Sequence, residues 1–273
     1  MPILGTRAGA SVNGYGMFGK AFPTAVVTGG TLSSDATYFY RTFTANGTLS
    51  VTNGTVSADY ALIAGGGGGG ASIYVDFGDG TGWGQIFYGG PGGAGGYQNA
   101  NAQNLSGSYS IVIGDGGSRG IYTGGIAPSA GSSTTGFGLT AAGGGAGAAT
   151  FTVNGGNGGC GGGAYGQYGT KDGPPGATGT GGTGSQGGNG TSGYPGAAGG
   201  SGTTPGTAGN SGVNIFSLGT TYGIGGGNRG GNTADGGTYG TPTITRFSGT
   251  NSADGSVGAK GIVIVRYLKS AVS

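Results

Sequence analysis

The hydrophobic pattern of the chain consists of short apolar runs separated by long glycine-rich stretches. Between residues 37 and 64, β-branched and aromatic residues alternate with polar ones, whereas residues 261–268 form the continuous apolar run GIVIVRYL. Alternation is typical of half-buried strands, and a continuous run is typical of a strand buried on both faces. Asn46-Gly47 and Asn53-Gly54 favour the tight turns of hairpins. We therefore expect a β-meander over residues 35–64. Its predicted strands are 37–45, 48–52 and 55–64.

Other short apolar and β-branched runs predict further strands. The C-terminal run needs a pairing partner, and DYALIA at residues 59–64 has a matching apolar character. Pairing of the two runs closes a sheet between opposite ends of the glycine-rich region. We therefore expect residues 258–273 to complete the sheet that residues 35–64 begin. The other predicted strands are 109–113, 150–153, 213–218 and 243–247.

Glycine is regularly spaced in the middle region, residues 65–257. It occupies every third position from 181 to 202, and it follows a Gly-Gly-X period at 89–96 and 155–163. A period of three is that of the polyproline II helix, which has three residues per turn and no internal hydrogen bonds. Each buried N–H and C=O of such a helix needs a partner on a neighbouring segment. Close approach of the segments requires glycine on the facing edges.

Two architectures fit this spacing: a collagen triple helix and a bundle of polyglycine II helices from one chain. Residues 173–212 contain only four prolines, and the glycine phase slips at 202–206. Collagen is disrupted by such defects and needs only one glycine in three. A bundle accounts for Gly-Gly-X, because a helix with several neighbours needs glycine on several edges. The expected fold is mostly β and irregular: a small β-sheet framing a bundle of antiparallel polyglycine II helices, with essentially no α-helix.

Composition limits the alternatives to this fold. Of 273 residues, 79 are Gly and only 7% are charged, and glycine disfavours α-helices. High glycine content also suits a disordered linker. However, the chain has 15 Tyr, 10 Phe and 1 Trp, which is more aromatic surface than disordered segments carry. We therefore expect an ordered chain.

Few residues suited to catalysis or metal binding are present. The chain has no His and no Glu, and Cys160 is its single cysteine, so the commonest general base and paired thiolate ligands are absent. Asp76 and Asp79 lie close in sequence, but Asp79-Gly80 suits a turn better than a cation site. The net charge is +2 without a basic cluster, which disfavours nucleic-acid binding. We expect no enzyme activity, no cofactor and no bound metal.

The N-terminal region suggests attachment to a partner rather than export. It lacks the charged and apolar regions of a signal peptide, and no apolar run approaches the length of a membrane span. We therefore expect synthesis in a cytoplasm and no membrane insertion. The scattered apolar residues of 1–34 suit packing onto a partner, or a frayed terminus. The candidate attachment residues are Ile3, Leu4, Tyr15, Phe18 and Phe22.

Aromatic and basic residues interrupt the glycine tracts. Loops on a rigid scaffold are common recognition sites, and Tyr and Trp give a large contact area at low entropy cost. The same rings also suit packing at the ends of a bundle, and the sequence leaves both roles open. The candidate receptor-binding residues are Trp83, Tyr88, Tyr165, Tyr168, Lys171, Tyr194, Tyr222, Arg229 and Tyr239.

Three features together resemble the glycine-rich virion proteins of tailed bacteriophages: DYALIAGGGGGG at 59–70, the repeated glycine tracts, and GAKGIVIVRY at 258–267. They are similar to tail-fibre-tip adhesins with polyglycine II bundles. The resemblance implies loops that bind a host surface receptor, either a polysaccharide or an outer-membrane protein. It also implies an N-terminal part that docks onto another virion protein. The position on the virion stays open.

Two other functions fit the same features. One is a purely structural virion component, either a capsid decoration or a fibre protein. The other is an ice-binding antifreeze protein, since some of these are polyglycine-helix bundles with a flat face of short side chains such as Thr and Ala. Such proteins are typically small, exported and often stapled by disulfides, and this chain has a single cysteine.

Overall fold

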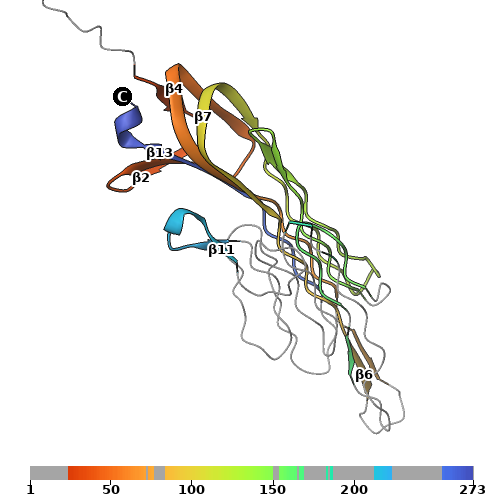
Figure 1. Ribbon diagram of the computed structural model, residues 1–273. Coiled ribbons are helices and arrows are strands. Elements are labelled where there is room, and N and C mark those ends of the chain that lie inside the picture. Colours follow the sequence, from red (N-terminus) through yellow and green to blue (C-terminus); the bar gives the residue numbers. More distant parts are fainter. Residues whose placement is uncertain are drawn as a thin grey trace, which may run out of the picture.

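The computed structural model describes residues 24–71, 73–76, 84–149, 154–164, 166–168, 183, 185–186, 212–222 and 254–272. The molecule is elongated, with a curled β-sheet at one end and glycine tracts running from it toward the opposite end (Figure 1). We call these the sheet end and the distal end. The described part is mostly β and contains no α-helix, as the sequence predicts.

Six strands form the curled sheet. Their order is β1-β4-β13-β3-β2, and β7 also pairs with β4. All of the pairs are antiparallel. The strands are β1 (Val26–Thr28), β2 (Thr31–Ser34), β3 (Tyr38–Phe43), β4 (Gly47–Ile63), β7 (Tyr97–Ile111) and β13 (Ile262–Leu268).

Strand β13 is the one predicted from GIVIVRYL, and its pairing with residues 59–64 is confirmed. It pairs with the second half of β4, where Ile264 lies opposite Ala61, and its other edge pairs with β3. Val263 and Val265 belong to a hydrophobic core shared with β1, β3, β4 and β7. Ile262 and Ile264 belong to a second core on the other face. Burial on both faces explains why this run is continuously apolar.

The predicted meander is wrong, because β4 is one long strand. Asn53-Gly54 forms a bulge instead of a hairpin turn: Asn53 has φ 59°, and the register with β7 shifts between Val51 and Val56. The first half of β4 pairs with β1, and the second half pairs with β13. The Asn-Gly pair at the start of β4 closes no hairpin either, because β13 lies between β3 and β4.

Other predicted boundaries also differ from the structure. The sheet begins before residue 35, since β1 and β2 belong to it. The predicted strand 109–113 overlaps the end of β7, whereas 213–218 contains β11 (Val213–Asn214) and the single-turn 3-10 helix η1 (Ile215–Ser217). Residues 1–23 and the predicted strands 150–153 and 243–247 lie outside the described residues.

Residues 213–222 cover the second hydrophobic core. Ile215 and Tyr222, which lies in β12 (Thr221–Tyr222), are buried against β4 and β13. Arg266 of β13 adds a polar contact: its guanidinium carbon lies 4.4 Å from the centre of the Phe216 ring, and its Nε donates a hydrogen bond of 2.8 Å to Asp59. This segment is therefore tied to the sheet by apolar burial and by a cation–π contact.

Backbone hydrogen bonds join the glycine tracts side by side. In residues 65–70, three successive N–H groups donate to three different tracts, and the set repeats from the fourth residue. The residue number of the acceptor falls by three when the residue number of the donor rises by three, so these neighbouring tracts run antiparallel to residues 65–70. This period of three matches the glycine spacing. The donor–acceptor pairs are Gly65–Ser132, Gly66–Ala259, Gly67–Gly93, Gly68–Ser129, Gly69–Ser256 and Gly70–Gly90.

The number of neighbours explains how much glycine a tract contains. Residues 65–70, all glycine, donate to three tracts and also accept hydrogen bonds from tracts 114–120 and 142–149. In the outer tract 254–261, glycine recurs only at every third position, and Val257 is 48% exposed. The glycines of this tract face inward, because a Cβ on Gly258 would lie 2.0 Å from the carbonyl oxygen of Gly66. One glycine edge therefore suffices for an outer tract.

The described tracts associate within one chain. Tract 65–70 has antiparallel neighbours, and a collagen helix consists of three parallel chains. The collagen alternative therefore does not apply to the described tracts. Most of the regularly spaced stretch 173–212 lies outside the described residues.

The close packing of backbones predicts an asymmetric response to adding one methyl group. A Cβ on Gly68 would lie 1.9 Å from the Ser118 carbonyl oxygen, whereas a Cβ on Gly124 would lie 3.3 Å from the flexible Ile126 side chain. We expect Gly68→Ala to lower the free energy of unfolding by about 3 kcal/mol or more. Gly124→Ala should change it by less than about 1 kcal/mol. Urea unfolding checks both, and equal effects would contradict this packing.

Candidate binding surface

A small three-stranded sheet lies at the distal end (Figure 1). It consists of β5 (Ile73–Asp76), β6 (Gly84–Tyr88) and β10 (Gly166–Tyr168), in the order β10-β6-β5. Tyr168 pairs with Ile86, and Gly166 pairs with Tyr88. Two of the predicted receptor-binding residues, Tyr88 and Tyr168, therefore lie on neighbouring strands of the same sheet.

A tight hairpin at residues 121–126 belongs to the same end. Ile121 and Ile126 exchange both backbone hydrogen bonds, of 2.9 and 3.1 Å, and the Gly125 N–H donates to the Tyr122 carbonyl at 3.2 Å. Gly125 has φ 60°, a conformation that glycine adopts without steric cost. The turn presents Tyr122, which is 40% exposed, and Ile126, which is 53% exposed.

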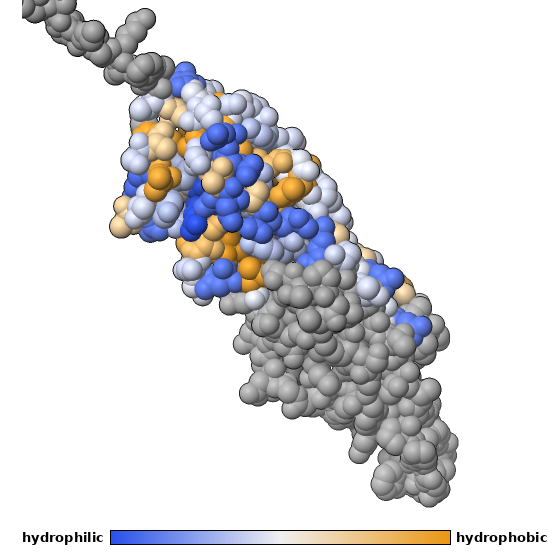
Figure 2. Space-filling view, viewed as in Figure 1, coloured by the Kyte–Doolittle hydropathy of each residue, from blue (hydrophilic) through white to orange (hydrophobic). Residues whose placement is uncertain are grey.

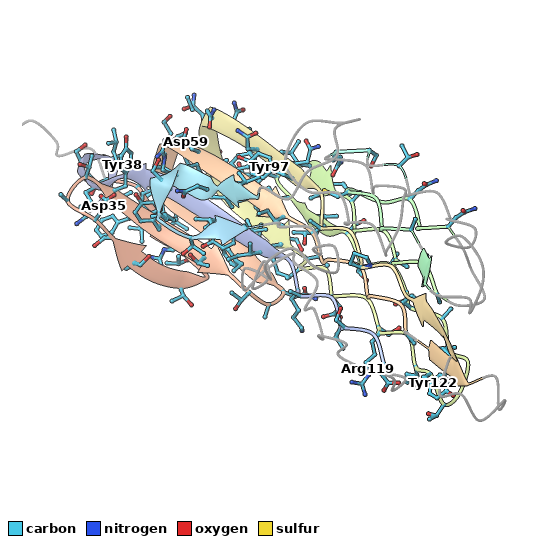
Figure 3. All side chains as sticks on the ribbon, turned by 90° about the horizontal axis from the view of Figure 1, so that it is seen from below. Asp35, Tyr38, Asp59, Tyr97, Arg119 and Tyr122 are labelled. Carbon is cyan, nitrogen blue, oxygen red and sulfur yellow. The ribbon has the colours of Figure 1, made fainter. Side chains whose placement is uncertain are left out.

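Charged groups flank this hairpin. The Tyr122 N–H donates to one carboxylate oxygen of Asp254 at 3.0 Å, and Arg119 lies 3.5 Å from the other oxygen. Half of the Arg119 side chain is exposed. Figure 3 shows Arg119 and Tyr122 together at the distal end, far from Asp35 and Tyr38 at the sheet end. Asp254 thus holds the hairpin to the outer tract and leaves the guanidinium accessible.

A shallow apolar depression connects the hairpin to the small sheet. Ile73 of β5 lines it together with the hairpin, so the two elements form one continuous surface. We call this the distal surface, defined by Arg119, Tyr122, Ile126 and Asp254 with the adjoining β5–β6–β10 sheet. An aromatic and aliphatic centre with a charged rim is the common anatomy of a protein binding site. The residues lining the depression are Ala71, Ile73, Ile121, Tyr122, Gly125, Ile126 and Ala149.

Most of the candidate residues from the sequence lie outside the described residues. Only Tyr88, Tyr168 and Tyr222 are described. The receptor-binding candidates outside are Trp83, Tyr165, Lys171, Tyr194, Arg229 and Tyr239, and the attachment candidates outside are Ile3, Leu4, Tyr15, Phe18 and Phe22.

Tyr222 is a core residue instead of a receptor contact. The residue is only 7% exposed, and it packs with Ile215, Ile262 and Ile264 in the second hydrophobic core. The sequence showed an aromatic residue beside glycine, but the long-range contact with β13 is what buries it. The prediction for this residue is therefore corrected.

Tyr122 and Ile126 were missed by the sequence reasoning. They lie in IYTGGI, where two isoleucines flank four residues that end in a Gly-Gly pair. That arrangement is a hairpin signal, and it would have identified an aromatic side chain at the tip of a turn.

Both ends of the described chain lie at the sheet end. Ala25 and Val272 form an isolated parallel bridge there. Hydrophobic and hydrophilic residues are mixed on the visible face of this end, without one dominant apolar patch (Figure 2). The distal surface is therefore remote from the points where residues 24 and 272 leave the sheet.

Asp35 organises the turn before β3 at the sheet end. Its carboxylate accepts hydrogen bonds from the Thr37 and Tyr38 N–H groups, both at 2.7 Å, and from the Tyr40 hydroxyl at 2.5 Å. These hydrogen bonds lower the pKa of Asp35 to about 2, and the bond from Tyr40 contributes more than either of the two backbone bonds. The pKa of Tyr40 is raised to about 12, mainly by burial and to a smaller extent by the hydrogen bond to Asp35.

Groups suited to metal binding are not gathered in the described part of the chain. No cluster of three or more His, Cys, Asp or Glu side chains occurs there. Asp76 ends β5, whereas Asp79 lies outside the described residues, and Cys160 is buried within its tract. No helix among the described residues has the length and apolar character needed to span a membrane.

One family model matches the chain. It is described as a glycine-rich domain, and it covers residues 42–268, from the end of β3 to the end of β13. No curated protein matches the chain.

The Asp35 hydrogen bonds predict a loss of stability in acid. Since the folded-state pKa lies below the ordinary value of 3.8, the carboxylate stabilises the fold above about pH 4. That stabilisation disappears as the pH falls toward about 2. Asp35→Asn should therefore weaken the decline of the urea midpoint between about pH 5 and pH 2. Asp115→Asn is the control, because the Asp115 carboxylate is 71% exposed and its ion pair with the exposed Lys260 should contribute little to stability. A decline unchanged by Asp35→Asn would refute this role.

Proposed function

The chain belongs to the glycine-rich domain family, and on that premise we propose that it is a virion surface protein of a tailed bacteriophage. Its role is that of a tail-fibre adhesin, which attaches to another virion protein at the sheet end and contacts the host cell at the distal end. The partner on the host is a surface polysaccharide or an outer-membrane protein.

The polarity of the molecule is the observation that carries this proposal. Ala25 and Val272 lie together at the sheet end, so residues 1–23 join the described part there. Tyr122 lies at the opposite end (Figure 3), and Ile126 belongs to the same hairpin; both side chains are exposed. An adhesin needs this separation, because attachment at one end leaves the other end free to reach a cell.

The glycine tracts supply a scaffold suited to this role. We infer that they adopt polyglycine II geometry, because successive N–H groups in 65–70 donate to three neighbours with a period of three. A lattice held by backbone atoms leaves the connecting loops free to vary in sequence. Loops on such a rigid base are favoured positions for recognition.

The alternatives receive less support from the described residues. Ice binding calls for a flat face of short, uncharged side chains. The outer tracts instead carry an exposed ion pair, Asp115 with Lys260 at 2.9 Å, and a second one, Arg119 with Asp254. A purely structural virion component does not require the exposed aromatic and aliphatic side chains of the distal hairpin.

Binding to host cells tests the proposal. Labelled full-length protein should bind a host strain, and free surface polysaccharide or outer-membrane protein should compete. The double substitution of Tyr122→Ser with Ile126→Ser should weaken binding about tenfold or more, as expected for central residues of an interface. Leu32→Ser is the matched control, because Leu32 is 50% exposed but lies at the sheet end.

The proposal has two distinct points of failure. If the protein binds to none of the bacterial strains tested, the adhesin role is wrong and a structural role is favoured. If cells bind but the double variant behaves like Leu32→Ser, the receptor contact lies elsewhere than the distal hairpin. Unchanged thermal unfolding of each variant ensures that a loss of binding is not a loss of fold.

A further inference from the structure

We propose that Asn53 is a site of spontaneous deamidation in the folded protein, independently of the adhesin function. Asn followed by Gly favours this reaction, because glycine has no Cβ to crowd its own attacking nitrogen. The described residues contain four such pairs, and the structure sets one of them apart. The pairs are Asn46-Gly47, Asn53-Gly54, Asn154-Gly155 and Asn157-Gly158.

The reaction needs only water as a co-reactant. The backbone nitrogen of Gly54 attacks the side-chain carboxamide carbon of Asn53 and loses its proton, and ammonia leaves, which closes a five-membered succinimide. Water then opens the ring at either carbonyl. One opening gives aspartate, and the other gives isoaspartate, in which the main chain runs through the former side chain.

Side-chain freedom distinguishes Asn53 from two of the other asparagines. The Asn46 carboxamide oxygen accepts a hydrogen bond of 2.8 Å from the Ile113 N–H. The Asn157 oxygen accepts one of 2.7 Å from the Thr183 N–H. Asn53 is exposed, and its side chain has no hydrogen-bond partner among the described residues. Its carboxamide is therefore free to rotate toward Gly54.

The bulge at Asn53 also accommodates the product. Pairing between β4 and β7 is interrupted from Val51 to Val56, so the extra main-chain atom of isoaspartate falls where the ladder is already out of register. At Asn46 the same change would break the contact to Ile113, which joins the end of β7 to the start of β4. The fold therefore tolerates the modification at Asn53 better than at Asn46.

The modification places a new negative charge at the sheet end. Gly54 lies beside Ala25, since a Cβ on it would be 3.6 Å from the Ala25 Cβ. The carboxylate would thus stand close to where residue 24 leaves the sheet. Aged protein should carry this charge as a second, more acidic species.

Peptide mapping of aged protein tests the proposal. The intact chain is incubated at mildly alkaline pH and cleaved after aromatic residues, which releases residues 44–60 with Asn46 and Asn53 in one peptide. Fragmentation then locates the amide-to-acid mass change, and isoaspartyl methyltransferase labelling identifies the isomer. Asn53 should be modified about two- to tenfold faster than Asn46, because only Asn46 must first break a hydrogen bond.

The denatured chain is the matched control. In concentrated urea both asparagines lose their structural context, so they should react at similar rates. The proposal is overturned if Asn46 and Asn53 react equally in the folded protein, or if Asn53 reacts only after denaturation. Asn53→Asp, which imitates one product, should keep the thermal unfolding temperature of the parent; a large decrease would show that the bulge does not tolerate the charge.

Discussion

The structure depends on lateral hydrogen bonds between backbones that lie too close together for side chains. At Gly68, the position that a Cβ would take is occupied by a carbonyl oxygen of the neighbouring tract. Each hydrogen bond contributes only about 0.5–1.5 kcal/mol net, while glycine loses more conformational entropy on folding than any other residue. The tracts therefore need another element that fixes their ends.

The curled sheet is that element. β4 continues into tract 65–70, tract 89–96 continues into β7, and tract 254–261 continues into β13. Both β7 and β13 pair with β4. Their tracts are therefore already aligned with tract 65–70 where they meet the sheet, which reduces the entropy lost when the tracts come together. Side-chain burial stabilises the sheet end and backbone bonding extends the molecule. The distal end is left to carry exposed side chains, as the proposed adhesin requires.

Sequence patterns predicted the elements that depend on local periodicity. The apolar run of β13, its partner in β4 and the period of three in the glycine tracts follow from residue spacing. The bulge at Asn53 did not, because the same dipeptide suits a hairpin, and pairing with distant β1 and β13 decides between them. Most of β7 is polar, so its pattern gave little signal. At the candidate site, contact with β13 converts Tyr222 from an expected surface residue into a core residue, whereas Tyr122 was overlooked.

Hydrogen-bond scalar couplings across the tracts test the central claim most directly. In isotope-labelled protein, the amide nitrogens of Gly65, Gly66 and Gly67 should couple to the carbonyl carbons of Ser132, Ala259 and Gly93, respectively. Three successive donors with three separate partners distinguish this lattice from a sheet, in which successive N–H groups of a strand point alternately to its two edges and so reach at most two neighbouring strands. Couplings of the three amides to only one or two segments, or no couplings in 65–70, would contradict the account.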